Sequence, residues 1–343
     1  MEEIIYLDNA ATTKIRPSVV EAMLPYLTEE YGNPSSVYSL AARSRNAISG
    51  ARERIAESLG AKPEEIYFTA GGSEADNWAL KSVAEANREK GNHIITTKIE
   101  HHAILHTCEY LEQMGYEITY LGVDEAGRVN ISELRKAIRA TTILISVMAA
   151  NNEIGTLEPI KEIGQIAKEH NIYFHTDAVQ AYGQIPISVE ECHIDLLSAS
   201  GHKLNGPKGV GFLYIRRGIR IGSFLHGGAQ ERKRRAGTEN VSGIVGLGKA
   251  VELAFADLEE RAKRERELRD YLMDRIMSEI PYTRINGDRT NRLPNNANFS
   301  FQFIEGESLL IMLDIKHICA SSGSACTSGS SKPSHVLVAI GLP

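Results

Sequence analysis

The chain has 343 residues, of which 42% are hydrophobic and 24% charged, and its net charge is −6. The apolar content excludes a mainly disordered chain, because it is enough for a sizeable core. The acidic balance argues against a dedicated nucleic-acid binder, and no apolar run approaches the roughly 18 residues of a membrane helix. The length predicts two domains, or one large domain with a smaller lobe.

The N-terminus and the cysteine content indicate the cellular setting. The first three residues, Met1 to Glu3, are acidic and lack the basic start and apolar core of a signal peptide. Four cysteines (Cys108, Cys192, Cys319 and Cys326) are too few for a disulfide framework in a chain of this length. We therefore expect a cytoplasmic protein in which each cysteine is core filler, a metal ligand or a nucleophile.

Strands and helices alternate along the first 255 residues. Short strand-like runs are predicted at 66–69, 93–97, 117–123, 142–148, 172–175, 194–198 and 209–215. Helical patterns lie between most of them, at 73–86, 104–114, 131–140 and 160–170. This alternation predicts βαβ units and an α/β fold with a mainly parallel sheet.

The pattern changes near residue 255. A long charged amphipathic helix is predicted over 252–279, and a strand, a helix, a Ser/Gly-rich loop and a last helix are predicted at 298–303, 308–315, 321–331 and 334–340. This order of elements predicts a small α+β domain at the C-terminal end of the chain.

The first motif with chemical potential is Ala70-Gly71-Gly72-Ser73, at the end of a predicted strand. Two glycines turn the chain and a helix begins at Ser73, where free N–H groups and the positive end of the helix dipole suit a phosphate. Ser73 followed by Asp76 is also an ordinary capping box, so this motif alone leaves both interpretations open.

Two further motifs end predicted strands. Asp177, in His175-Thr176-Asp177, faces the crevice where ligands bind in parallel sheets, although a helix N-cap is the alternative. Lys203, in Gly201-His202-Lys203, can bond covalently to a carbonyl when cations lie near it, although a lone lysine is more often a surface residue. A phosphate cradle, a strand-end carboxylate and such a lysine together fit pyridoxal phosphate, whose pyridinium nitrogen pairs with the Asp.

Longer motifs follow one another in order along the chain. They are Tyr6-Leu7-Asp8-Asn9-Ala10-Ala11-Thr12-Thr13, Tyr31-Gly32-Asn33-Pro34-Ser35-Ser36, Ile99-Glu100-His101, Ala150-Asn151-Asn152-Glu153-Ile154-Gly155 and Ser321-Ser322-Gly323-Ser324-Ala325-Cys326-Thr327-Ser328. With the three motifs above, they resemble those of the NifS/IscS-type cysteine desulfurases, which belong to the class V aminotransferase group of fold-type I pyridoxal phosphate enzymes. The last motif resembles the longer type of catalytic-cysteine loop rather than the SufS-like type.

The resemblance implies a fold and a division into domains. It implies a large domain over 16–255, with a mainly parallel seven-stranded sheet between helices, and a small α+β domain over 256–343. The N-terminal segment, 1–15, is expected near the active site and the small domain. The family continues past the last helix with a strand whose arginine binds the substrate carboxylate, so we expect the small domain here to lack its last segment.

The resemblance also implies the roles of individual residues. Lys203 attaches the cofactor, Cys326 accepts sulfur, and His101 stacks on the cofactor ring and moves protons. Cofactor contacts are implied for Gly72, Ser73, His101, Asp177, Gln180, Ser200, His202, Lys203 and, from the other subunit of a homodimer, Thr238. Substrate contacts are implied for Asn152 and Asn9. No metal site is expected, apart from the suggestion that Cys326 ligates a nascent iron–sulfur cluster.

The implied activity is the conversion of L-cysteine to L-alanine with a persulfide on Cys326. The sulfur would pass to an iron–sulfur scaffold protein of the NifU/IscU type or to tRNA thiolation, without membrane or direct nucleic-acid contact. A selenocysteine lyase and a weakly active, cofactor-binding docking scaffold are the alternatives. Among the remaining residues, Cys108 and Cys319 are expected to be buried and Cys192 to lie in a turn. The basic run 231–235 is expected to be a solvated loop; electrostatic support near the cofactor phosphate or of an acidic partner is the alternative.

Overall fold

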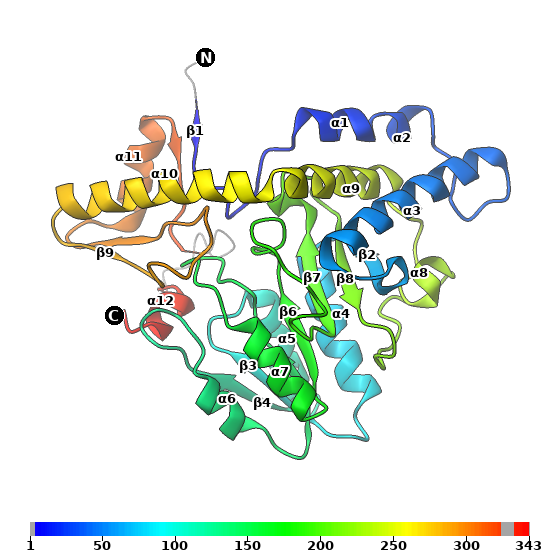
Figure 1. Cartoon of the computed structure of the whole chain (residues 1–343), viewed down its shortest axis with the longest axis horizontal. Helices are drawn as coiled ribbons and strands as arrows, with labels where there is room; N and C mark the ends of the chain where they lie inside the picture. Colours follow the sequence, from blue (N-terminus) through cyan, green and yellow to red (C-terminus); the bar gives the residue numbers. More distant parts are fainter. Residues whose placement is uncertain (1–3, 324–332, 343) are drawn as a thin grey trace.

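The computed structural model describes residues 4–323 and 333–342. Its centre is a seven-stranded sheet with the strand order β2-β8-β7-β6-β5-β3-β4 (Figure 1). The strands are β2 (Ile66–Thr69), β3 (His93–Thr97), β4 (Glu117–Leu121), β5 (Thr142–Ser146), β6 (Tyr173–Asp177), β7 (Leu196–Ser200) and β8 (Gly211–Ile215). Only β8 runs antiparallel to its two neighbours within this sheet. The predicted mainly parallel, seven-stranded α/β sheet is therefore confirmed.

Both faces of the sheet are covered, which explains why most of its strands are buried along their whole length rather than at alternate residues. One face packs on α4 (Gly72–Ala86) and α5 (His102–Gln113), and the other on α3 (Ser39–Leu59), α7 (Ile160–Glu169) and α9 (Val241–Ala256). Consecutive residues of one strand face opposite ways, as β7 illustrates. Leu196 belongs to the first core and Leu197 to the second. The remaining helices of this part are α1 (Pro17–Met23), α2 (Pro25–Thr28), α6 (Ile131–Ala137), α8 (Gln230–Lys233) and the 3-10 turns η1 (Pro63–Glu65) and η2 (Gly201–Lys203).

The helix α3 was not predicted, although it is 21 residues long. Its buried stripe includes three alanines and one serine rather than a run of large apolar residues. Small residues are needed there because α3 and α9 approach closely. A Cβ added to Gly248 of α9 would lie only 2.7 Å from the Cβ of Ala51. The weak hydrophobic periodicity of α3 is thus the result of tight helix packing.

A smaller C-terminal lobe, residues 258–323 and 333–342, lies beside the sheet (Figure 1). It contains α10 (Leu258–Glu279), the antiparallel pair β9 (Thr283–Ile285) and β10 (Phe299–Phe301), α11 (Gly306–Ile315), β11 (Ile318–Cys319) and α12 (His335–Ala339). The strand β1 (Ile5–Tyr6), from the other end of the chain, pairs in parallel with β11. We call this part the C-terminal lobe below.

The helix predicted over 252–279 is two helices, and that prediction was wrong. α9 ends at Ala256 and α10 begins at Leu258, with Asp257 between them outside the helical conformation (φ −126°, ψ 18°). The carbonyl of Ala254, freed by this break, accepts a hydrogen bond from Arg261 (3.1 Å). A charged helix face continues across the break, so the sequence pattern did not reveal it.

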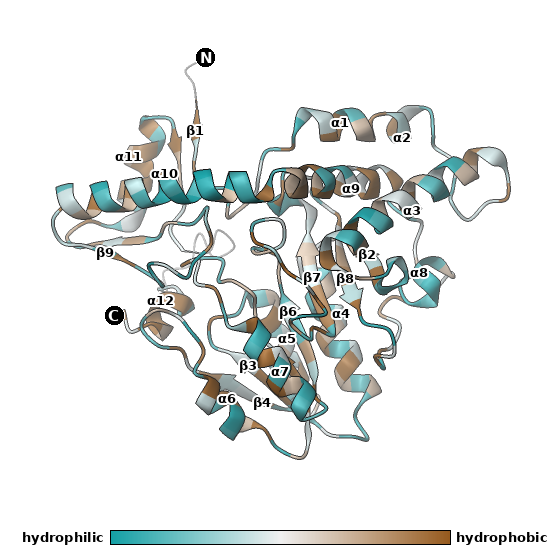
Figure 2. Cartoon of the chain, viewed as in Figure 1, coloured by the Kyte–Doolittle hydropathy of each residue, from teal (hydrophilic) through white to brown (hydrophobic). Residues whose placement is uncertain are grey.

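The distribution of apolar residues differs between the helices of the lobe. Figure 2 shows α10 as mostly hydrophilic and α11 as mostly hydrophobic. Within the described parts of the chain, no helix combines the length and the apolar character that crossing a membrane requires.

Candidate active site

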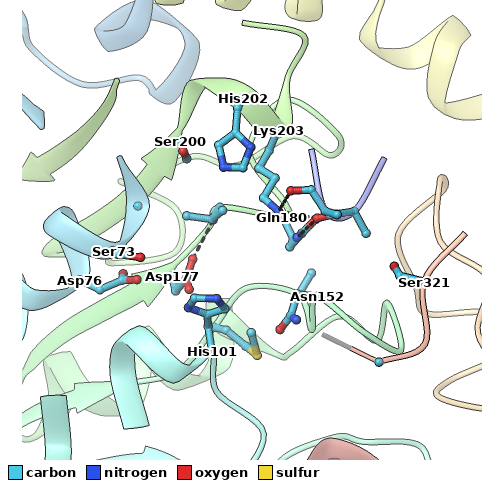
Figure 3. A pocket seen from close by; sticks show the side chains of 17 residues that line it. Ser73, Asp76, His101, Asn152, Asp177, Gln180, Ser200, His202, Lys203 and Ser321 are labelled. Carbon is cyan, nitrogen blue, oxygen red and sulfur yellow. Dashed lines mark hydrogen bonds between the residues drawn. The ribbon is translucent and has the colours of Figure 1, made fainter. Parts of the chain in front are cut away.

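One pocket lies at the carboxyl ends of the central strands, where α/β sheets bind ligands (Figure 3). It receives residues from the starts of α4 and α5, the ends of β6 and β7, the turn η2 and the N-terminal segment. Its lining consists of Ala10, Ala11, Gly72, Ser73, Asp76, His101, Met148, Ala150, Asn152, Asp177, Val179, Gln180, Ser200, His202, Lys203, Ser321 and Gly323. Nine of the residues predicted for the site are thus brought together from five separate stretches of sequence.

The N-terminus of α4 opens into this pocket. Gly71 has φ +151°, a conformation that L side chains rarely adopt, and a Cβ on Gly72 would lie 2.5 Å from Val179. The two glycines therefore let the chain turn tightly and approach the strand ends closely. Because the first N–H groups of a helix lack intrahelical partners, this 15-residue helix offers donors and a positive dipole end to an anion.

Of the two interpretations of the motif at Ser73, the capping box with Asp76 is contradicted by the structure. Gly71 is the N-cap of α4 and no side chain caps the helix. Instead, Glu74 Oε2 accepts a hydrogen bond from the Ala70 N–H (3.1 Å), and Glu74 forms a two-point ion pair with Arg235 (2.8 and 3.1 Å). Glu74 therefore accepts the hydrogen bond at the start of the helix, and Ser73 and Asp76 lie on the pocket wall (Figure 3).

Asp177 is held as an acceptor at the end of β6. It is 5% exposed, and its Oδ1 accepts a hydrogen bond from the Val179 N–H (2.8 Å), which pins a turn rather than capping a helix. Burial raises the pKa of Asp177 to about 6, while the Val179 N–H and the charge of Lys203 act in the opposite direction. A cation bound in the pocket would therefore strongly favour the ionised form of this carboxyl group.

A second acid and a histidine lie behind Asp177. Asp76 is 1% exposed, and burial together with the charge of Asp177 raises its pKa well above the ordinary range. His175 bonds through its two ring nitrogens to Ser146 (2.9 Å) and Ser198 (3.0 Å), and burial lowers its pKa to about 3. His175 is neutral at pH 7, so it supplies no positive charge that would oppose the rise in the pKa of Asp76.

Lys203 meets the N-terminal segment across the pocket. Its Nζ donates hydrogen bonds to the carbonyl oxygens of Ala11 (2.9 Å) and Ala10. Gln180 Nε2 donates to the same Ala10 carbonyl (3.0 Å), and His202 Nδ1 lies 3.1 Å from Thr12 Oγ1. The amine, the amide and the imidazole are therefore aligned along one wall.

His101 forms the opposite wall as the N-cap of α5. Its Nδ1 accepts a hydrogen bond from the Ala103 N–H (3.1 Å), which assigns the ring proton to Nε2. Burial, with a smaller effect of the positive charge of Lys203, lowers the pKa of His101 to about 4. At neutral pH it is an uncharged ring that can pack flat against an aromatic ligand and donate one proton.

Three predicted site residues are not among those that line the pocket. Asn9 is exposed and its amide donates to the Tyr6 carbonyl (3.3 Å). Thr238 is exposed in the loop before α9. Cys326 lies outside the described residues, but Ser321 and Gly323, which precede it in sequence, do line the pocket, and Ser321 Oγ donates to Asp8 Oδ1 (2.5 Å).

Several pocket residues were missed by sequence reasoning. Asp76 was interpreted as part of a capping box, and its burial gives no signal in a single sequence. Ala10 and Ala11 contribute backbone carbonyl oxygens, which every residue type carries, so their identity could not reveal them. The resemblance of the motif 6–13, which contains both alanines, pointed to this segment but not to the two carbonyl groups.

The basic run 231–235 is only partly the solvated loop that was predicted, because Arg232 and Lys233 are exposed whereas its other three residues are buried or half-buried. Glu231 is buried and forms a two-point ion pair with Arg52 (2.7 and 2.9 Å). The guanidinium groups of Arg232 and Arg234 lie over the ring of Tyr67, 5.0 and 5.3 Å from its centroid. The run therefore packs on the edge strand β2, because aromatic faces and a buried carboxylate offset its charge.

The three cysteines that the structure describes are each buried or partly buried. Cys108 is fully buried and burial raises the pKa of its thiol, while Cys192 lies half-buried in a turn, as predicted. Cys319 is only partly buried, because its strand β11 belongs to the thin two-stranded sheet of the lobe. Within residues 4–323 and 333–342, no group of three or more His, Cys, Asp and Glu side chains is arranged to hold a metal ion.

Comparisons with known proteins place this geometry in context. The profile of the family described as Aminotransferase class-V matches residues 5–341. A protein named Cysteine desulfurase IscS from Methanosarcina thermophila is 62% identical over 339 residues, 99% of this chain and 84% of that protein. Its namesake from Dictyoglomus turgidum is 56% identical over 343 residues, 100% of this chain and 87% of that protein.

Solved structures are similar over nearly the whole chain. A structure titled NifS-like protein matches with a TM-score of 0.94 and 40% identity, covering 99% of this chain and 90% of that one. A structure titled SspA in complex with cysteine matches with a TM-score of 0.87 and 39% identity, covering 99% of this chain and 95% of that one.

Proposed function

The chain belongs to the class V aminotransferases, in their cysteine desulfurase family, and from this premise we propose that it removes sulfur from L-cysteine with bound pyridoxal phosphate. The products would be L-alanine and a persulfide on Cys326. The single observation that best supports this proposal is the convergence of Lys203, Asp177 and the N-terminus of α4 on one pocket.

The residues of the pocket fit the cofactor. When bound, pyridoxal phosphate draws electrons away from the substrate carbon atoms and so makes their bonds labile. Gly72, Ser73 and the first N–H groups of α4 would hold its phosphate, together with Ser200 and His202. The close approach of Gly72 to Val179 supports this assignment, since any side chain at position 72 would fill the cradle.

Three side chains would hold and tune the cofactor ring. Asp177 would pair with the pyridine nitrogen, and its burial makes such a pair strong because water does not screen it. His101, neutral at pH 7, would stack on the ring. Gln180, whose amide points to the same wall as Lys203, would donate to the ring hydroxyl (Figure 3).

Lys203 would attach the cofactor and, once displaced by the substrate amine, take the proton from the substrate α-carbon. Asn152, on the pocket wall, and Asn9 would bind the substrate carboxylate. These roles leave the sulfur atom of the substrate facing outward for attack.

Cys326 would carry out the sulfur transfer as a thiolate. It attacks the substrate sulfur, an S–S bond forms, and the Cβ–S bond breaks with its electron pair moving to the substrate carbon. Protonation at that carbon then completes the methyl group of alanine. The step balances as L-cysteine plus the Cys326 thiol giving L-alanine plus the Cys326 persulfide.

Partners follow from the same proposal. The chain would act as a homodimer in which Thr238, exposed in this single chain, reaches the cofactor phosphate of the other subunit. The persulfide would pass to a thiol of an iron–sulfur scaffold protein of the NifU/IscU type, or enter tRNA thiolation, in the cytoplasm. Cys326 would also be the residue placed to ligate a nascent iron–sulfur cluster.

The proposal is tested with the holoenzyme and L-cysteine. Alanine release and the mass increase of one sulfur on Cys326 are measured in the wild type, Lys203→Ala, Cys326→Ala and the matched control Cys192→Ala. We expect losses of alanine release of about 100-fold or more in the first two variants and none in the control. Lys203→Ala should also lose the visible absorbance of the attached cofactor. A wild type that does not take up pyridoxal phosphate, or full activity in Cys326→Ala, would contradict the proposal.

A further inference from the structure

The two ends of the segment that contains Cys326 meet at one buried carboxylate. Glu153 Oε2 accepts a hydrogen bond from Ser334 Oγ (2.5 Å). A Cβ added to Gly323 would lie 3.4 Å from the same oxygen and 3.5 Å from the Cβ of Ser334. Gly323, Ser334 and Glu153 therefore form a compact junction, which we call the neck. Gly323 precedes and Ser334 follows the segment 324–332.

Glu153 is fixed by its own turn. Asn151, which is fully buried, accepts hydrogen bonds from the N–H groups of Glu153 (2.9 Å) and Ile154 (3.0 Å) through Oδ1. Its Nδ2 donates to the Ile99 carbonyl (2.8 Å). The Glu153 carbonyl in turn accepts from the amides of Asn296 and Asn298, both at 3.1 Å. The backbone of Glu153, which carries the carboxylate, is thus anchored both to the sheet region and to the lobe.

The burial of the Glu153 carboxyl group costs free energy that an apolar side chain of similar size would not. It is 5% exposed, and its Oε1 is buried without a hydrogen-bond partner among the described residues. Burial raises its pKa, and the Ser334 hydroxyl only partly opposes this effect. A buried carboxyl group with only one neutral hydrogen-bond donor destabilises the folded state. An apolar side chain at position 153 would give a more stable fold if packing were its only role.

Anchoring of α12 does not need Glu153. Val336 and Ile340 of this region are buried against Ile99, Met148 and Ile154, which form an apolar cluster of their own. Ser334 caps α12 by accepting from the Val336 N–H (3.1 Å), whether or not its hydroxyl also donates to Glu153. What Glu153 adds is one carboxylate oxygen that lies close to both Ser334 and Gly323.

The turn also links the neck to the pocket. Asn152, the residue before Glu153, lines the pocket, and so does Gly323. Cys326 is three residues beyond Gly323, and three residues span at most about 11 Å. The position of Gly323 therefore limits how far the Cys326 thiol can reach from the pocket wall.

We propose that Glu153 is a positioning residue that fixes the neck and thereby directs the Cys326 thiol to the sulfur of the bound substrate. The inference rests on the proposed function for the role of Cys326. It assigns no contact between Glu153 and either substrate or cofactor, so it predicts a defect in sulfur transfer alone.

The test compares three variants of the holoenzyme: Glu153→Ala, Glu153→Gln and the control Glu125→Ala, whose side chain is exposed. Substrate binding is followed by the change in cofactor absorbance on adding L-cysteine. Sulfur transfer is followed by the single-turnover rate of persulfide formation on Cys326, measured by mass spectrometry. A third measurement, the alkylation rate of Cys326 by iodoacetamide in the resting enzyme, needs no turnover.

We expect Glu153→Ala to slow persulfide formation about tenfold, because small misplacements of a reacting group reduce rates strongly, while the absorbance change on cysteine binding stays intact. Its alkylation rate should change about threefold or more. Glu153→Gln should stay within about twofold of the wild type in each measurement, since its Oε1 can still accept from Ser334. Glu125→Ala should match the wild type.

Two results would overturn the inference. One is a persulfide rate in Glu153→Ala equal to that in Glu125→Ala. The other is a loss of the cysteine-dependent absorbance change that accompanies the slower rate, which would indicate a general structural role. If the wild type forms no persulfide on Cys326, the proposed function fails instead. The alkylation rates then decide the role of the neck: a difference between Glu153→Ala and Glu125→Ala supports it, and equal rates refute it.

Discussion

The central sheet and the C-terminal lobe reach stability in different ways. In β3, β5, β7 and β8 every residue is buried, whereas every residue of β9 and β10 is only partly buried. The strands of the lobe occur in two-stranded sheets, and α11 has no buried residue at all. Two-stranded sheets are marginal on their own, so the lobe depends on its neighbours in a way that the central sheet does not.

The two regions also contribute different residues to the pocket. The sheet region supplies Lys203, Asp177 and the start of α4, whereas the residues that the lobe contributes, among those the structure describes, are Ser321 and Gly323. A rigid, double-covered sheet suits groups that must hold a cofactor in one position. A lobe with a small core suits a part of the enzyme whose position relative to the sheet depends on a few polar contacts, such as those of the neck.

The comparison is tested most strongly by one substitution made in both regions. Phe174 in β6 is fully buried, whereas Phe303 in the lobe is 87% exposed. We expect Phe174→Ala to lower the free energy of unfolding by about 3–5 kcal/mol, because it leaves a cavity in a packed core. Phe303→Ala should change it by less than about 1 kcal/mol, since it loses mainly an exposed edge-to-face contact with Tyr282.

The measurement uses the only tryptophan. Trp78 is fully buried in α4, so its fluorescence reports unfolding of the sheet region, while far-ultraviolet circular dichroism also follows the helices of the lobe. The two urea transitions should separate, with the circular dichroism change beginning first. Coincident transitions, together with similar losses for both phenylalanine variants, would show that sheet and lobe share one core.

A second prediction concerns the stability that the sheet loses by holding an acid in its pocket. Because burial raises the pKa of Asp177 from 3.8 to about 6, its ionised form destabilises the folded cofactor-free chain above pH 6. Asp177→Asn, which can still accept from the Val179 N–H, should stabilise this chain by up to about 3 kcal/mol at pH 8.

The sign of the effect fixes its pH dependence. The wild-type chain binds an extra proton on folding between pH 4 and pH 6, so the advantage of Asp177→Asn should shrink as the pH falls through 6 and vanish near 4. Thermal melts of both chains at several pH values measure this. A constant gap at all pH values would contradict the assignment of the charge to Asp177. The same variant should bind pyridoxal phosphate more weakly, since it cannot pair with a pyridinium.

The smallest effect is expected on the surface of the lobe. Ile315 in α11 is 68% exposed, so Ile315→Ser should change the free energy of unfolding by less than about 0.5 kcal/mol. It should also reduce self-association on gel filtration, because exposed apolar groups on neighbouring positions promote contact between molecules. A loss above 1 kcal/mol would mean that another part of the assembled enzyme covers this face.

The two regions also differ in how well the sequence predicts them. The strands of the sheet were predicted to within a few residues, because burial on both faces leaves continuous apolar runs. The lobe and its junction were less predictable. The break at Asp257 lies within a charged face that continues across it. The strand β9 was missed because a short, half-buried strand leaves almost no periodicity.

The pocket shows the same limit at the level of single residues. Lys203, Asp177 and Ser73 were found because their side chains follow strand ends in recognisable motifs. Asp76 was assigned to a capping box because its spacing from Ser73 fits that short-range pattern. Its burial in the pocket results from tertiary structure, which a single sequence does not show. The contribution of Ala10 and Ala11 is made by backbone atoms, and no residue type predicts that.

The pairing of β1 with β11 determines the order in which the chain can assemble on the ribosome. Ile5 pairs with Ile318, and Asp8 accepts from Ser321 across 313 positions of sequence. At about 5–20 residues per second, the first strand waits roughly 15–60 s for its partner to be synthesised. During that time the sheet can already have formed, and so can the contact of Lys203 with Ala11. The residues of β1, although synthesised long before β11, are thus among the last to reach their final place, and a nascent chain stalled before residue 318 leaves β1 unpaired.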